Sequence, residues 1–75
     1  MYDETIRMKL IKARERSGFT QKEVSEITKI PYYIIAKIES GHRKPDTETI
    51  GILAEFYNIT TDYIFGIGKK EKEES

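Results

Sequence analysis

The stretch that decides the fold is residues 19–39, which read FTQKEVSEITKIPYYIIAKIE. It opens with a capping box, because the Thr20 hydroxyl can accept a hydrogen bond from the amide of Glu23 while the Glu23 carboxylate reaches back to the Thr20 amide. Phe19 can pack on Val24 and so complete a hydrophobic staple at the same helix start. This combination predicts a helix that opens at about residue 20.

Pro31 separates that helix from the next. It disfavours helical geometry at the preceding residue and suits the first position of a new helix. The sequence therefore predicts one helix to about Thr28 and a second from about Pro31 to Ser40, ended by Gly41. Two short helices joined by so tight a turn have the geometry of a helix-turn-helix, whose second helix lies in the major groove of DNA.

Helical periodicity continues on both sides of this stretch, and no sustained strand-like alternation interrupts it. A helix is expected from about Thr5 to Ser17, and Gly18 is suited to end it. A fourth helix is expected after a cap at Asp46, and a fifth, short one after a cap at Thr60. Ile6, Leu10, Ala13 and Ser17 are expected to share one face of the first helix. Ile50, Leu53, Ala54 and either Phe56 or Tyr57 are expected to form the inward face of the fourth, and the fifth carries Tyr63, Ile64 and Phe65. The predicted fold class is all-α, with five short helices.

The helix after Pro31 has two distinct sides. At about 100° per residue, Ile35 and Ile38 fall on one side, and Tyr32, Tyr33, Ala36 and Lys37 fall within roughly 140° on the other. Tyrosine rings can contact thymine methyls, their hydroxyls can reach base edges or phosphates, and a lysine can donate to guanine. The alternatives are that one ring packs over the neighbouring helix and that Lys37 only faces solvent.

Charge is distributed unevenly along the 75 residues, although the net charge is zero. Residues 7–44 carry ten basic and four acidic side chains, whereas residues 45–66 carry four acidic and no basic ones. One end of the domain is therefore expected to attract phosphate. Four bases before Gly18 are expected to form only a solvated face: Arg7, Lys9, Lys12 and Arg16.

Composition excludes several other classes of function. The chain has no cysteine, which excludes disulfides and thiolate metal sites and suits a reducing cytoplasm. No apolar stretch approaches the ~20 residues needed to cross a bilayer, and the acidic start does not resemble a secretory signal. His42 stands alone, and there is no nucleophile elbow or phosphate-binding glycine loop. We expect a cytoplasmic protein that is not an enzyme and has no cofactor, metal, membrane or small-molecule ligand.

The chain resembles a known family over about residues 6–66. The residues that carry the resemblance are Leu10, Ala13-Arg14, Gly18-Phe19-Thr20-Gln21, Val24-Ser25, Ile27, Ile30, Ile35, Ile38-Glu39, Gly41, Arg43 and Pro45, then Ile50, Ala54, Tyr57-Asn58-Ile59-Thr60 and Asp62-Tyr63-Ile64-Phe65-Gly66. In this order and spacing they resemble the phage repressor and Cro-like (Xre-type) DNA-binding domains. The resemblance implies a lambda-repressor-like fold with the helix-turn-helix at its second and third helices.

The resemblance also implies roles for matching positions. Thr20 and Gln21 are expected to contact phosphate, Tyr32, Tyr33 and Lys37 to read bases, and Ser40, Arg43 and Lys44 to hold the DNA backbone. Arg14 and Glu39 match an ion pair that joins the first helix to the end of the third. Two positions depart from the family pattern: Lys29 stands where glycine is common, and Pro31 replaces a serine or threonine cap.

The expected function is sequence-specific regulation of transcription, as a repressor that binds duplex DNA as a homodimer, either weakly formed or induced by the DNA. Candidates for the dimer surface are Phe56, Phe65 and Ile67, whose alternative role is core packing. Two other functions stay open: the antitoxin of a toxin–antitoxin pair, and a protein-interaction module that kept the fold but lost DNA binding. The expected division is a DNA-binding domain at residues 1–66 and a flexible charged tail at residues 67–75.

Overall fold

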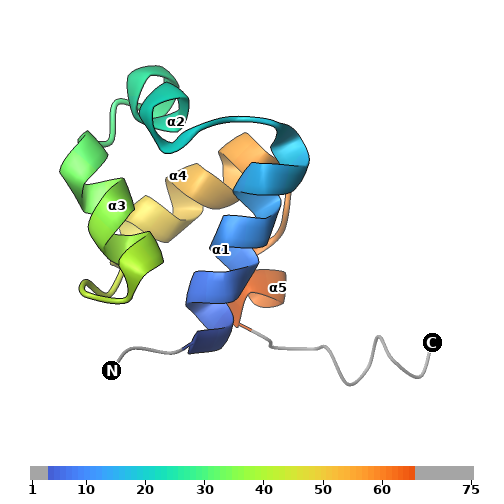
Figure 1. Ribbon diagram of the computed structural model, residues 1–75. Coiled ribbons are helices and arrows are strands. Elements are labelled where there is room, and N and C mark those ends of the chain that lie inside the picture. The colour runs from blue at the N-terminus through green and yellow to red at the C-terminus, as the bar shows by residue number, and fades with distance from the viewer. Residues whose placement is uncertain (1–3, 66–75) are drawn as a thin grey trace.

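A computed structural model describes residues 4–65 as a bundle of α-helices without strands (Figure 1). The helices are α1 (Glu4–Ser17), α2 (Gln21–Thr28), α3 (Tyr32–Ser40), α4 (Thr47–Tyr57) and α5 (Thr61–Phe65). This confirms the predicted all-α class with five short helices. Residues 66–75, which include the predicted tail and Ile67, lie outside the described part. None of the described helices combines the length and the apolar character needed to cross a membrane.

Three helices begin where a side-chain oxygen accepts a backbone amide, as predicted. The caps are Thr20 for α2, which accepts from Glu23 at 3.1 Å, Asp46 for α4, which accepts from Thr49 at 2.8 Å, and Thr60 before α5, which accepts from Tyr63 at 3.0 Å. The capping box of α2 is complete, because the Thr20 amide also donates to the Glu23 carboxylate at 2.9 Å. Each cap satisfies an amide that the first helical turn leaves without a partner inside the helix.

The third helix begins one residue later than predicted. Pro31 is its N-cap residue, with φ −55° and ψ 140°, and offers no side-chain cap. The first helical residue is therefore Tyr32, because ψ at Pro31 is still extended. The Pro31 carbonyl accepts from the amide of Ile34 at 3.0 Å and so opens the first turn.

Left-handed residues end the helices. Gly18, Gly41 and the non-glycine residues Lys29 and Asn58 all have positive φ, of 82°, 85°, 69° and 60°. Thr28 supports the strained turn at Lys29, because its hydroxyl donates to the Val24 carbonyl at 2.7 Å and accepts from the Ile30 amide at 3.3 Å. The turn between α2 and α3 is therefore closed by side-chain bonds where a glycine would relieve the strain.

The core lies where α1 packs against α3, α4 and α5, and where α2 packs against α3 and α4 (Figure 1). Its buried apolar residues are Leu10, Ala13, Val24, Ile30, Ile34, Ile35, Ile38, Ile50, Leu53, Ala54, Tyr57 and Ile64. Of the residues expected to share one face of α1, Ser17 is exposed, and in α5 Ile64 is buried whereas Tyr63 and Phe65 are exposed. Ser17 and Phe65 are the last residues of α1 and α5, so no further turn covers them.

Tyr57, rather than Phe56, is the buried aromatic residue at the end of α4. Phe56 is half-buried, with its ring centroid 5.0 Å from that of Phe19 and 5.3 Å from that of Tyr57. Phe19 thus closes the core between α1 and α2 through an aromatic contact with α4.

Glu39, in the last turn of α3, is the buried charged residue of the described core, with 7% of its surface exposed. Its carboxylate accepts from Arg14 Nε at 2.8 Å and Nη2 at 2.9 Å, a bidentate contact from α1. Gln21 Nε2, in the first turn of α2, donates to the same carboxylate at 2.9 Å. Arg7 Nη1 donates to the backbone carbonyl of Glu39 at 2.8 Å. We call these four residues the Glu39 cluster: three side chains from α1 and α2 converge on the carboxyl end of α3.

The cluster also shapes the local electrostatics. The hydrogen bonding that Arg14 donates to the Glu39 carboxylate raises the pKa of the Arg14 guanidinium above its usual value, so Arg14 stays charged. Burial, and to a lesser degree the negative charge of Glu39, raises the pKa of the Tyr57 phenol to about 12. Tyr57 is therefore neutral at physiological pH, and α4 presents an uncharged group to the cluster.

The Arg14–Glu39 pair gives the first prediction. Replacing Arg14 with Met leaves the Glu39 carboxylate buried without its cation, and we expect the free energy of unfolding to fall by ~3–5 kcal/mol. The double variant Arg14→Met, Glu39→Met should recover most of that loss, because no charge is then stranded. Denaturant unfolding measures both. Arg16→Ala, at an exposed site on α1, is the control and should change stability by less than ~0.5 kcal/mol. If Arg14→Met were as stable as Arg16→Ala, the role assigned to the Arg14–Glu39 pair would be wrong.

The left-handed turn residue gives the second prediction. Lys29→Gly should stabilise the domain by ~0.5–1 kcal/mol, because glycine adopts φ 69° without the steric cost that a Cβ atom imposes. Glu26→Gly, within α2, should instead cost ~1 kcal/mol. Thermal and denaturant unfolding of the two variants should therefore give opposite signs, and destabilisation by Lys29→Gly would show that the lysine side chain has a stabilising role.

Candidate nucleic-acid interface

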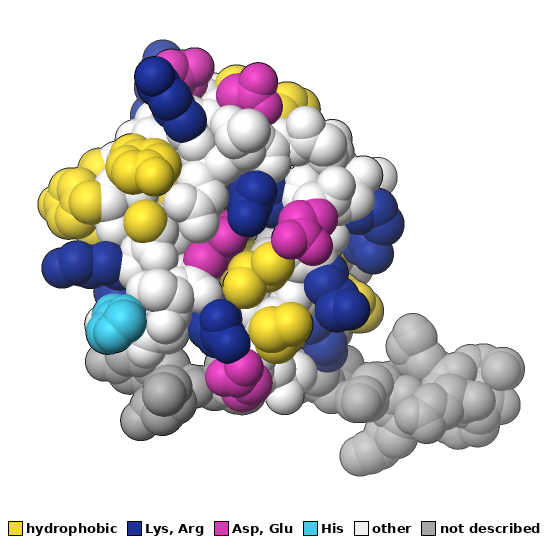
Figure 2. All heavy atoms as spheres, in the orientation of Figure 1, with side chains coloured by type: hydrophobic (Ala, Val, Ile, Leu, Met, Phe, Trp, Pro, Cys, Tyr) yellow, Lys and Arg dark blue, Asp and Glu magenta, His cyan; other side chains and the backbone are white. Residues whose placement is uncertain are grey.

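One side of α3 is buried and the other faces solvent. Ile34, Ile35 and Ile38 pack into the core, whereas the side chains of Tyr32 and Tyr33 remain exposed, at 53% and 59%. Both tyrosines are therefore more than half exposed, and contact of either ring with DNA bases stays a prediction. Figure 2 shows hydrophobic side chains gathered over the outer side of α3, with Lys and Arg side chains nearby.

Further along the same helix, Lys37 is exposed one turn after Tyr33, and Ala36 is half-buried one turn after Tyr32. Residues four apart lie above one another on a helix surface. The outer side of α3 therefore consists of two adjacent rows. One row contains the phenol ring of Tyr32 and the methyl group of Ala36, and the other contains the phenol ring of Tyr33 and the ammonium group of Lys37.

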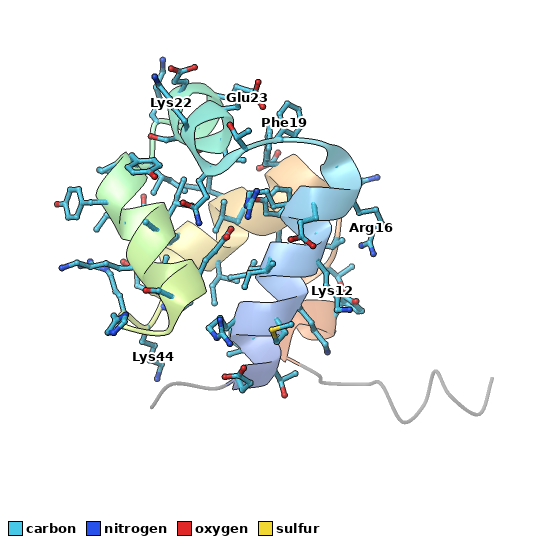
Figure 3. The ribbon with its side chains drawn as sticks, viewed as in Figure 1. Lys12, Arg16, Phe19, Lys22, Glu23 and Lys44 are labelled. Atoms are coloured by element: carbon cyan, nitrogen blue, oxygen red, sulfur yellow. The ribbon has the colours of Figure 1, made fainter. Side chains whose placement is uncertain are left out.

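The carboxyl end of α3 leads into a basic loop. Ser40 Oγ donates to the Lys37 carbonyl at 3.1 Å and lies 2.8 Å from Nδ1 of His42. Arg43 and Lys44 follow in exposed positions, and Figure 3 shows Lys44 below the lower end of α3. This loop can present two cations and a polar pair beside the outer side of α3.

The amino end of α2 lies at the opposite end of that surface. Thr20 is exposed but uses its hydroxyl as the helix cap, and the half-buried Gln21 uses its amide nitrogen in the Glu39 cluster. Lys22, which sequence reasoning did not single out, is exposed next to them and extends from the top of α2 in Figure 3. The first amides and the dipole of a helix favour an anion at its amino end, and Lys22 adds a positive charge there.

The remaining bases of α1 divide into two groups. Lys12 and Arg16 are exposed on the side of α1 away from α3 (Figure 3), which agrees with the solvated face expected for them. For Arg7 and Lys9 that expectation was wrong: Arg7 contacts the Glu39 carbonyl, and Lys9 Nζ donates to the Tyr63 carbonyl at 2.7 Å and lies 4.6 Å from the centre of the Tyr63 ring. Both partners are more than 30 residues away in sequence, so no local pattern could reveal them.

The arrangement can bind a polyanion but offers no metal site. Among the described residues, no group of three or more His, Asp or Glu side chains could hold a metal ion. The surface does offer the exposed side of α3, with the basic side chain of Lys22 near one end and that of Lys44 near the other (Figure 3). An exposed helix of this kind suits the major groove, whose width admits an α-helix, and the two flanking cations could contact phosphates.

Comparison with known proteins agrees with this geometry. A family model described as helix-turn-helix matches residues 10–64. The chain is 37% identical over 65 residues to "HTH-type transcriptional regulator ImmR" of Bacillus subtilis (strain 168), a match that covers 87% of this chain and 51% of that relative. It is also 38% identical over 63 residues, 83% of this chain, to 6% of the length of glutamine–fructose-6-phosphate aminotransferase of Methanocaldococcus jannaschii.

The chain thus spans about half the length of the first relative and a short segment of the second. The family model, by contrast, covers most of this chain, from Leu10 in α1 to Ile64 in α5, and so includes the helix pair and the core around it. It also agrees with the expectation that the chain is not an enzyme. The chain belongs to the helix-turn-helix family, in the Xre-type group that its sequence resembles.

Proposed function

We propose that this chain is the DNA-binding part of a transcriptional regulator, a repressor that reads an operator half-site with α3 in the major groove. The observation that carries the proposal is the exposure of Tyr32, Tyr33 and Lys37 on a helix whose other side is buried. The family and the printed name of the Bacillus relative support the same function.

The proposed DNA contacts fall into two classes, contacts with bases and contacts with the DNA backbone. Tyr32, Tyr33 and Lys37 are the proposed base-reading side chains. The proposed backbone contacts lie on either side of α3: Thr20 and Gln21 at the start of α2, and Ser40, Arg43 and Lys44 after α3. Gln21 serves two purposes in this proposal, because its amide nitrogen supports Glu39 while its amide oxygen and backbone amide lie at the helix start.

Binding is proposed to involve two copies of the chain. A single module this small contacts few base pairs, so useful specificity needs two half-sites about 34 Å apart. Of the expected dimer residues, Phe56 is engaged by Phe19 and Tyr57, whereas Phe65 on α5 remains 43% exposed. We therefore place the contact between copies at Phe65.

Salt dependence and two lysine variants test the DNA contacts. Duplexes selected from a random pool should bind with an affinity that falls steeply as salt rises, because each phosphate contact releases counterions. Lys37→Ala should cost ~1–3 kcal/mol at one base position, whereas Lys44→Ala should weaken all sequences alike and reduce the salt slope by about 1. Lys12→Ala is the control on the far side of α1 and should change neither. If no duplex binds at low salt, the domain is a protein-interaction module; if both lysine variants act equally on every sequence, the assigned roles are wrong.

Sedimentation measurements test the proposed dimerisation of the chain. We expect two chains on an operator with two half-sites, and a weaker or absent dimer without DNA. Phe65→Glu should leave the affinity for a single half-site unchanged and remove the cooperativity between two half-sites, because the substitution places a charge in the proposed contact. A monomer at high concentration both with and without operator would exclude dimerisation, and unchanged cooperativity in the variant would move the contact away from α5.

A further inference from the structure

The side chains that α3 presents to solvent are chemically unusual for a helix that reads base edges. Its nine residues read YYIIAKIES, and the buried ones are Ile34, Ile35, Ile38 and Glu39. The outer side therefore offers two phenol rings, the methyl group of Ala36, one ammonium group at Lys37 and the hydroxyl of Ser40. That hydroxyl is already engaged by the Lys37 carbonyl and the His42 ring.

The groups that pair most specifically with adenine or cytosine are missing from this surface. Adenine is read by the amides of Asn or Gln, cytosine by a carboxylate, and guanine by Arg or Lys, of which α3 has only Lys37. Helix α3 contains no Asn, Gln or Arg, and its carboxylate is held inward by Arg14. The amide nitrogen of Gln21, on the neighbouring helix, is also bound to that carboxylate.

What remains on α3 is apolar contact together with one cation. Thymine is the base that presents an apolar group in the major groove, its C5 methyl, and aromatic or alanine side chains contact it. Tyr32 lies one turn before Ala36, and Tyr33 lies one turn before Lys37. The row of Tyr32 and Ala36 could therefore contact thymine methyl groups, and the row beside it ends in the Lys37 ammonium group, which could donate to guanine.

We infer that Tyr32 and Tyr33, together with Ala36, recognise thymine through its C5 methyl group, and that the preferred half-site holds adjacent thymines next to a guanine read by Lys37. This inference rests on the proposed function, because it takes α3 to lie in the major groove. It assigns the rings, rather than the hydroxyls, as the specificity-determining groups.

The test removes single methyl groups from the DNA. In a duplex selected from a random pool, each thymine of the half-site is replaced in turn by deoxyuridine, which pairs as thymine does and lacks only the C5 methyl. Each contacted methyl should be worth about three- to fivefold in affinity, the factor that follows from the burial of one methyl-sized apolar group. Uracil placed outside the half-site should have no effect.

A double-mutant cycle, in which binding affinity is measured for each combination of protein variant and DNA variant, identifies the side chain that touches each methyl group. With Tyr33→Ser, affinity for the thymine duplex should fall, and the uracil replacement at the contacted position should have no further effect. With Tyr33→Phe, which keeps the ring, the uracil effect should persist. The same pair of variants applies to Tyr32, and Lys12→Ala should show the full effect of uracil. Because both tyrosines are more than half exposed, these variants should fold like the original chain.

The outcomes distinguish failure of thymine recognition from failure of the proposed function. A selected duplex that binds specifically, but whose affinity no uracil replacement changes, would overturn thymine reading and leave the proposed function standing. A uracil effect that Tyr→Phe abolishes would overturn the role of the rings in favour of the hydroxyls. Failure to bind any duplex at low salt would overturn the proposed function and the inference with it.

Discussion

Placement of α3 depends on the contacts that Glu39 receives. A helix of nine residues with no side-chain cap at its start is too short to be stable by itself, so its shape and orientation come from its neighbours. Isoleucines hold its inner side, but apolar packing is non-directional. Arg14, Gln21 and Arg7 add the directional bonds, and because they come from α1 and α2, the last turn of α3 is tied to both elements that precede it.

Local chemistry made most of the fold predictable from sequence. Capping residues such as Thr20 and Asp46 act within three residues, so their hydrogen bonds could be inferred from spacing alone. Family resemblance implied both the left-handed turn at Lys29, where glycine is common, and the ion pair between Arg14 and Glu39. The start of α3 was misplaced by one residue, since proline suits both the cap and the first helical position, and only the backbone angles distinguish them.

Contacts between distant segments could not be predicted in the same way. From the sequence, Arg7 and Lys9 were expected to be solvated side chains on an amphipathic helix. In the fold, the Arg7 guanidinium donates to a carbonyl oxygen of α3 and the Lys9 ammonium group donates to one of α5. A carbonyl oxygen carries no sequence signature, because every residue has one. At the candidate interface, periodicity separated the exposed tyrosines from the buried isoleucines, but it could not show that the amide of Gln21 and the hydroxyl of Ser40 are already engaged.

The nine residues of α3 keep buried and solvent-facing side chains on separate positions. Ile34, Ile35, Ile38 and Glu39 hold the helix, whereas Tyr32, Tyr33 and Lys37 point outward. Exchange of an outward side chain therefore changes the stability of the scaffold very little. Under the proposed function, point mutations at these three outward positions would change the DNA target while the supporting residues of the chain stay untouched.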